Sequence, residues 1–168
     1  MKQIAVKILI TILFISVSDI ILAQKRSETT IILIRHAEKD TAATNPGLSV
    51  AGKARAEKLL KKFKKLKVDE MYSTPYKRTT ETLTPWAQKK HLTIKNYDAG
   101  NIKAFAAELK TRKGKTIVVA GHSNTTPALV NLLLGSEKYK PLDDSVYTKI
   151  WLLIISDDGT ITEKTMKY

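Results

Sequence analysis

Two of the histidines in this chain follow apolar runs that have the character of buried strands. Residues 31–34 lead directly into Arg35 and His36, and residues 117–120 lead through a glycine to His122. The carboxyl ends of neighbouring strands form the ligand crevice of an open α/β sheet. Because the whole chain has only three histidines, two of them at such positions indicate a functional site.

A third strand-like segment, residues 68–72, leads to a second arginine, Arg78. Arginine presents a planar fork of N–H donors that holds phosphate oxygens in pairs. Histidine can attack phosphorus and form a covalent intermediate, which divides one difficult step into two. Two arginines and two histidines at one sheet edge therefore predict a pocket for a dianion of the size of phosphate.

Other chemistries fit these residues less well. A metal site needs three or four donors from His, Cys, Asp or Glu, whereas Arg35 and Arg78 would repel a cation. The sequence has no Gly-x-Ser-x-Gly motif, which argues against a serine hydrolase. We therefore expect neither a metal ion nor an organic cofactor.

The elements that must position these residues alternate between strand and helix. Four strand-like segments are each followed by a helical segment, and Ser49 can cap the first helix. A hairpin around Asp157-Asp158-Gly159 follows. This order predicts a single-domain, three-layer α/β/α sandwich around a mostly parallel, mixed sheet. The expected strands cover residues 29–34, 68–72, 92–97, 116–120, 149–155 and 160–166, and the later helices cover residues 79–90, 101–112 and 125–134.

The first 23 residues have the pattern of a signal peptide. Lys2 and Lys7 precede an apolar stretch at residues 8–17, and Ala23 marks the expected cleavage site. Asp19 interrupts the apolar stretch, which is shorter than the roughly 18 residues of a spanning helix. We expect residues 1–23 to be removed on export to the periplasm or the medium, and residues 24–168 to form the domain.

The chain is strongly basic, with a formal net charge of +13, and it has no cysteine. Such a charge favours anionic partners. The helix after Ser49 carries many lysines, so it could hold the protein at an anionic membrane surface. Nucleic-acid binding is disfavoured because no aromatic residues interleave with these lysines to stack on bases. The lysines are Lys53, Lys58, Lys61, Lys62 and Lys65.

Four motifs, in this order along the chain, resemble the histidine phosphatase superfamily, whose fold is that of phosphoglycerate mutase. They are Leu-Ile-Arg-His-Ala-Glu-Lys at residues 33–39, Asn-Pro-x-Leu-Ser-x-x-Gly at residues 45–52, Tyr-Ser-Thr-Pro followed by Arg78, and Gly-His-Ser-Asn at residues 121–124.

The resemblance implies a role for each matching residue. His36 would be the nucleophile that becomes phosphohistidine. The phosphoryl oxygens would be held by Arg35, Arg78, His122 and Asn124. His122 would be cationic when phosphate is bound, since a nearby anion raises the pKa of a histidine. The helix that begins after Asn124 would direct N–H groups toward the anion.

Asp98 is the expected general acid that protonates the leaving group, and Glu38 is the alternative. Asp98 ends the third expected strand, where many members of the family place an acid, and Glu38 lies two residues after the nucleophile. Ala37 replaces the glycine that often follows the histidine in this family. That difference makes a mutase of the glycolytic type a weaker interpretation.

These observations predict an exported, metal-independent phosphomonoesterase with an open pocket. Its substrate would be a small phosphorylated molecule such as a sugar phosphate, or a phosphorylated glycolipid of the envelope. One alternative is a phosphotransfer enzyme, either a mutase or a phosphatase of phosphohistidine in proteins. Another is a module that binds phosphate or polyanions without turnover.

Overall fold

The computed structural model of the chain describes residues 28–41 and 43–168. The expected signal peptide at residues 1–23 lies outside the described residues. Within them, no helix is long and apolar enough to cross a bilayer.

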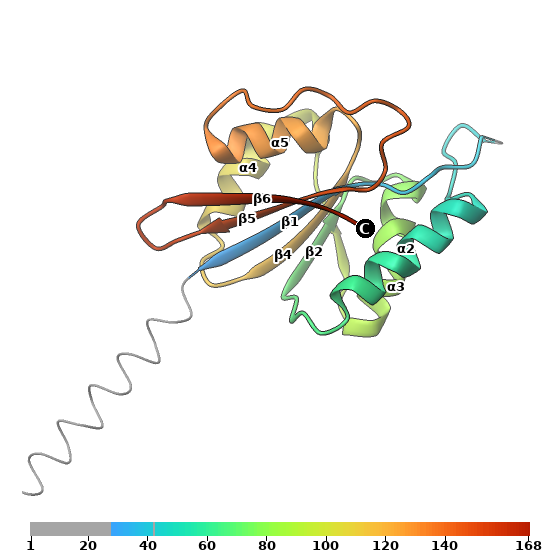
Figure 1. Ribbon diagram of the computed structural model, residues 1–168, viewed down its shortest axis with the longest axis horizontal. Helices are drawn as coiled ribbons and strands as arrows, with labels where there is room; N and C mark the ends of the chain where they lie inside the picture. Colours follow the sequence, from blue (N-terminus) through green and yellow to red (C-terminus); the bar gives the residue numbers. More distant parts are fainter. Residues whose placement is uncertain (1–27, 42) are drawn as a thin grey trace, which may run out of the picture.

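A single six-stranded mixed sheet forms the middle of the domain (Figure 1), in the order β3-β2-β4-β1-β5-β6. The first four strands pair in parallel, and β5 and β6 add an antiparallel hairpin. This arrangement confirms the mostly parallel sheet expected from the sequence. The strands are β1 Thr29–Arg35, β2 Glu70–Ser73, β3 Ile94–Asn96, β4 Thr116–Gly121, β5 Lys149–Ile155 and β6 Ile161–Lys167.

Helices cover both faces of the sheet, as Figure 1 shows, with α2 and α3 on one side and α4 and α5 on the other. The three-layer α/β/α prediction is therefore confirmed. The helices are α2 Val50–Phe63, α3 Lys77–Lys90, α4 Ile102–Thr111 and α5 Thr125–Leu134, and a short 3₁₀ turn, η1, covers Ala99–Asn101.

The central strand β1 is buried on both faces, which explains its unbroken apolar sequence. Ile31 and Leu33 pack in the core under α4 and α5, while Ile32 and Ile34 pack in the core under α2 and α3. A strand that contributed to only one core would show polar alternation instead. The end of this strand is therefore a fixed point from which Arg35 and His36 project.

The local differences from the sequence expectation are small. Strand β3 is three residues long instead of the expected six, because only residues 94–96 pair with β2. Although a proline can interrupt a helix, α3 continues through Pro85 without a break. The turn η1, capped by Asp98, was not expected. Ser49 caps α2 as predicted, since its hydroxyl accepts a hydrogen bond from the Gly52 N–H at 3.1 Å.

Candidate active site

The parallel pairing of β1 with β4 brings the two motif histidines together. Arg35 is opposite Gly121 in the ladder, and the His36 N–H donates to the Gly121 carbonyl at 2.9 Å. The rings of His36 and His122 then lie edge to face, with 5.4 Å between their centroids. The site is therefore a direct consequence of strand register.

A cavity of about 520 Å³ opens at this edge of the sheet. It contains all the residues predicted to hold the phosphoryl group, namely Arg35, His36, Arg78, His122 and Asn124. The complete lining is Arg35, His36, Lys39, Tyr76, Arg78, Ala99, His122, Ser123, Asn124, Thr125, Asp144 and Tyr147.

His36 is oriented by its own loop. Its Nδ1 lies 2.7 Å from the Ala37 carbonyl oxygen, which can only accept, so Nδ1 carries the hydrogen and Nε2 carries the lone pair. Burial lowers the pKa of His36 to about 4, and the neighbouring charges of His122, Arg78 and Arg35 act in the same direction. A neutral imidazole with a free Nε2 lone pair is the form that a nucleophile requires.

His122 is held between an arginine and a threonine. Arg78 Nη2 lies 3.4 Å from His122 Nδ1 and can only donate, so the hydrogen of the neutral ring is on Nε2, 2.9 Å from Thr74 Oγ1. Burial lowers the pKa of His122 to about 4, followed by the charges of Arg78 and Arg35. The cationic form expected beside a bound phosphoryl group stays a prediction.

Thr74 belongs to a buried hydroxyl network to which sequence reasoning gave no role. Its Oγ1 lies 2.9 Å from Thr79 Oγ1, and Thr79 also donates to the Tyr76 carbonyl at 2.7 Å. Both threonines are fully buried. The Ser-Thr-Pro-Tyr motif therefore fixes the start of α3, and with it the position of Arg78.

Arg35 forms hydrogen bonds with the loop at residues 143–146, for which the sequence gave no functional signal. Its Nη1 donates to the carbonyls of Asp143, Asp144 and Val146 at 2.9, 3.2 and 3.1 Å, and its Nη2 contacts the Asp144 carboxylate at 3.2 Å. The ring of Tyr147 covers the same guanidinium at 4.2 Å. These contacts explain how a charged side chain that is 4% exposed is tolerated next to the core.

Each of the two arginines has one buried N–H donor without a hydrogen-bond partner among the described residues. These donors are Nε of Arg35 and Nε of Arg78. A buried donor left unpaired costs roughly 1–3 kcal/mol. Because both arginines line the cavity, an anion bound there could satisfy these donors, and the site fits the predicted dianion.

The loop after His36 ties Glu38 away from the reaction. Gly52 allows this packing, because a Cβ atom there would lie 2.1 Å from the Glu38 carbonyl oxygen. The Glu38 carboxylate accepts from Arg55 Nε at 2.8 and 2.9 Å, and this hydrogen bonding lowers the pKa of Glu38. A carboxyl group held in its ionised form is poorly suited to donate a proton.

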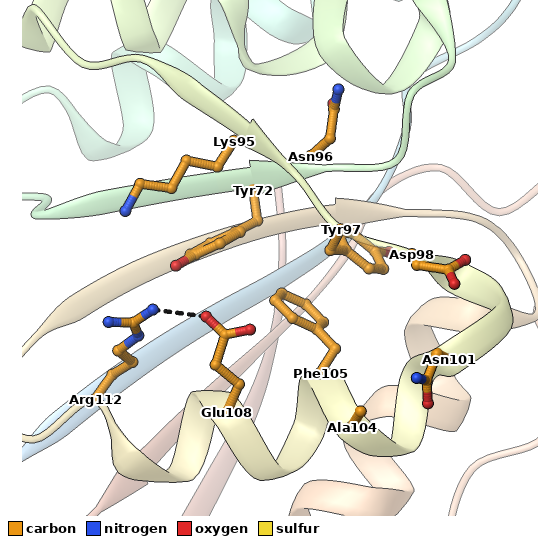
Figure 2. A pocket seen from close by; sticks show the side chains of 10 residues that line it. All are labelled: Tyr72, Lys95, Asn96, Tyr97, Asp98, Asn101, Ala104, Phe105, Glu108 and Arg112. Carbon is orange, nitrogen blue, oxygen red and sulfur yellow. Dashed lines mark hydrogen bonds and ion pairs between the residues drawn. The ribbon is translucent and has the colours of Figure 1, made fainter.

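Asp98 does not join the group around His36. It is exposed and caps η1 by accepting from the Gly100 N–H at 2.8 Å. Figure 2 shows it at the rim of a different cavity, which lies beside Tyr97 and Phe105. Its neighbour Ala99 lines the first cavity, so the two cavities adjoin at this turn. The role of Asp98 as general acid stays a prediction.

No cluster of three or more His, Cys, Asp or Glu side chains that could hold a metal ion occurs in residues 28–41 and 43–168. The fold and the site define an α/β protein. At the ends of its two central parallel strands lies a cavity lined by two arginines, which suits an anion.

Comparisons with known proteins found a family model that matches part of the chain. The model of the histidine phosphatase superfamily (branch 1) matches residues 31–100. No curated protein matches the chain. The family match and the solved structures described next confirm the resemblance to phosphoglycerate-mutase-like histidine phosphatases.

Three solved structures share the fold. The protein histidine phosphatase SixA, complexed with tungstate, has a TM-score of 0.67 and 17% identity, and the match covers 82% of this chain and 96% of that one. A mycobacterial glucosyl-3-phosphoglycerate phosphatase has a TM-score of 0.67 and 13% identity, with 84% and 98% covered. A phosphoserine phosphatase from Entamoeba histolytica, in complex with 3-phosphoglyceric acid, has a TM-score of 0.62 and 18% identity, with 83% and 97% covered.

Proposed function

We propose that this protein is a metal-independent phosphomonoesterase that acts through phosphohistidine on His36. The observation that carries the proposal is that one cavity is lined by His36 together with Arg35 and Arg78, and that Nε of each arginine is buried without a hydrogen-bond partner among the described residues. They supply charge and hydrogen bonds where a phosphoryl group would lie. The likeness to structures of phosphatases supports the same class of chemistry.

The reaction proceeds in two displacements at phosphorus. The His36 Nε2 lone pair forms a bond to phosphorus while the bond to the leaving oxygen breaks, and the leaving alkoxide takes up a proton. Water then attacks the phosphohistidine, which releases inorganic phosphate and restores the imidazole. Arg35, Arg78 and His122 stabilise the charge on the oxygens in both steps.

The test compares wild type with His36→Ala on p-nitrophenyl phosphate, with a chelator present. His91→Asn is a matched control, because His91 is an exposed histidine with φ of 55°, a conformation that asparagine tolerates. Activity should vanish in His36→Ala and persist in His91→Asn. Acid-labile labelling of His36 should accompany turnover. Binding of phosphate or vanadate without any turnover would instead indicate a module that only binds anions.

A second candidate is a phosphatase of phosphohistidine in proteins, and the carboxyl groups favour it. Of the two expected acids, Glu38 is paired with Arg55 and Asp98 lies on the rim of the other cavity. A phosphorylated imidazole that carries a proton on its other nitrogen leaves as neutral imidazole, a weak base, so it needs less help from an acid than a leaving alkoxide does. The likeness to SixA supports this alternative. A higher kcat/KM on phosphoimidazole than on an alkyl phosphate would select it.

We also propose that the protein is exported and meets its phosphorylated substrate near an anionic surface. All five lysines of the predicted patch are exposed, four of them on α2 and Lys65 just after its end. Co-sedimentation with vesicles that contain anionic lipid should decrease as salt rises. Equal binding to neutral vesicles would contradict this placement, and detection of the protein in the cytosolic fraction alone would contradict export.

A further inference from the structure

Two tyrosines on the cavity wall have no part in the chemistry described so far. Tyr76 comes from the turn before α3, and Tyr147 comes from the loop between α5 and β5. Both line the cavity that contains His36. The arginines and histidines already supply the proposed contacts with the phosphoryl group, so the two tyrosines have no assigned role.

Tyr76 is held in place although its ring is 43% exposed. Among the described residues, only Val50 is another large apolar side chain with this degree of exposure. The ring lies 4.5 Å from the Arg78 guanidinium and meets the His122 ring edge to face at 5.1 Å. A fixed, exposed aromatic ring at the mouth of a cavity is a surface that a ligand can contact.

Tyr147 stands in the same relation to the other half of the site. Its ring covers the Arg35 guanidinium at 4.2 Å and lies 6.1 Å from the His36 ring. The loop that carries it is fixed by the three carbonyls that bind Arg35. Each phosphoryl arginine is thus paired with one tyrosine, and each catalytic histidine has one tyrosine ring beside it.

We propose that Tyr76 and Tyr147 form the subsite for the leaving group and select a planar aromatic ring, so that the preferred substrates are aryl phosphates. In an in-line displacement the leaving oxygen departs on the side of phosphorus opposite His36, within the cavity that both rings line. Aromatic rings attract one another in offset or edge-to-face contact, which a saturated ring of the same size cannot reproduce. This inference rests on the proposed phosphatase function.

The test uses two inhibitors that differ only in the ring. Benzylphosphonate and cyclohexylmethylphosphonate carry the same anionic group and cannot be hydrolysed, so the reactivity of the leaving group does not enter. We expect the inhibition constant against p-nitrophenyl phosphate to be about 10-fold lower for the aromatic compound. Both compounds carry the same phosphonate, so a change in how strongly the arginines bind it affects both inhibition constants equally and leaves their ratio unchanged.

Tyr76→Leu and Tyr147→Leu should each reduce that ratio to about 3, and the double variant to about 1, because leucine keeps apolar area without an aromatic face. Tyr76→Phe and Tyr147→Phe should keep the ratio near its wild-type value. Equal inhibition constants in wild type, or an unchanged ratio in the double leucine variant, would overturn the inference.

Failure of the proposed function would look different. It would appear as absent turnover of p-nitrophenyl phosphate, and calorimetry would then still measure the ratio of phosphonate affinities. A phosphotyrosine side chain in a short peptide should be hydrolysed as fast as phenyl phosphate if the ring alone is recognised. A much slower rate on the peptide restricts the preference to small aryl esters, and a faster rate on glycerol 2-phosphate than on phenyl phosphate contradicts it.

Discussion

The proposed nucleophile should stay neutral far below the pH at which an ordinary histidine becomes charged. Burial and the charges of His122, Arg78 and Arg35 lower the pKa of His36 from 6.5 to about 4. At pH 5.5, a group with a pKa of about 4 is about 97% neutral, whereas one with a pKa of 6.5 is about 9% neutral. The environment therefore gives a roughly tenfold larger fraction of reactive imidazole at that pH.

Imidazole chemical shifts measured by NMR from pH 3 to 8 test this directly. With three histidines in the chain, signals can be assigned with His36→Gln and His122→Gln. Arg78→Ala should raise the pKa of His122, because the charge of Arg78 lowers it in wild type. That rise should be incomplete, because burial is the larger cause. A midpoint near 6.5 for His36 would refute the reasoning, as would a lower pKa for His122 in Arg78→Ala.

The same shift links pH to stability. Because the folded pKa of His36 is depressed, the unfolded state binds more protons between about pH 4 and 6.5. Stability should therefore fall as the pH decreases through this window. His36 contributes at most roughly 3–4 kcal/mol to the loss, at 1.36 kcal/mol per pKa unit. Thermal unfolding should show a smaller acid destabilisation in His36→Gln, and an equal one in both proteins would contradict the linkage.

Three further predictions concern residues around the site. Arg35→Lys should lower kcat/KM on p-nitrophenyl phosphate by at least 100-fold, because lysine cannot bind the phosphoryl group and the loop carbonyls together; a loss below fivefold would contradict the role of this guanidinium. Glu38→Gln should keep most activity, because Glu38 pairs with Arg55 and does not line the cavity, but should lower the free energy of unfolding by about 1–2 kcal/mol; loss of turnover with unchanged stability would restore Glu38 as the general acid. Asp98→Asn should leave the structure intact, because asparagine can still accept the hydrogen bond from the Gly100 N–H. A fall in kcat of about 100-fold or more, restricted to alkyl phosphates, would establish Asp98 as the general acid. Unchanged rates would exclude that role.

The fold and the convergence of the four candidate site residues were predictable because they depend on local sequence. Unbroken apolar runs such as residues 31–34 signal strands that are buried on both faces, and the residues after them must appear at one sheet edge. Ser49 marked the start of the first helix correctly. The assembly of Arg35, His36, Arg78 and His122 followed from these signals.

The rest of the site depends on contacts that no local pattern encodes. Asp144 and Tyr147 lie in a loop without periodicity, and only the distant Arg35 makes that loop part of the cavity. The choice between Asp98 and Glu38 could not be made from the sequence for a similar reason. The Arg55 partner of Glu38 lies on another element, and the local preference of aspartate for turns competes with any catalytic use of Asp98.

The pairing of β1 with β4 also determines when the protein can acquire the proposed activity. His36 and His122 come together only when β1 pairs with β4, and these strands are far apart in the chain. The loop whose carbonyls accept hydrogen bonds from Arg35 is synthesised later still. Contacts of such high sequence separation form late and slowly, because loop-closure entropy opposes them until the core assembles. A nascent or unfolded chain therefore contains all the reactive groups but no site. The appearance of turnover during refolding would report formation of the central β1–β4 pair, and not merely collapse or helix formation.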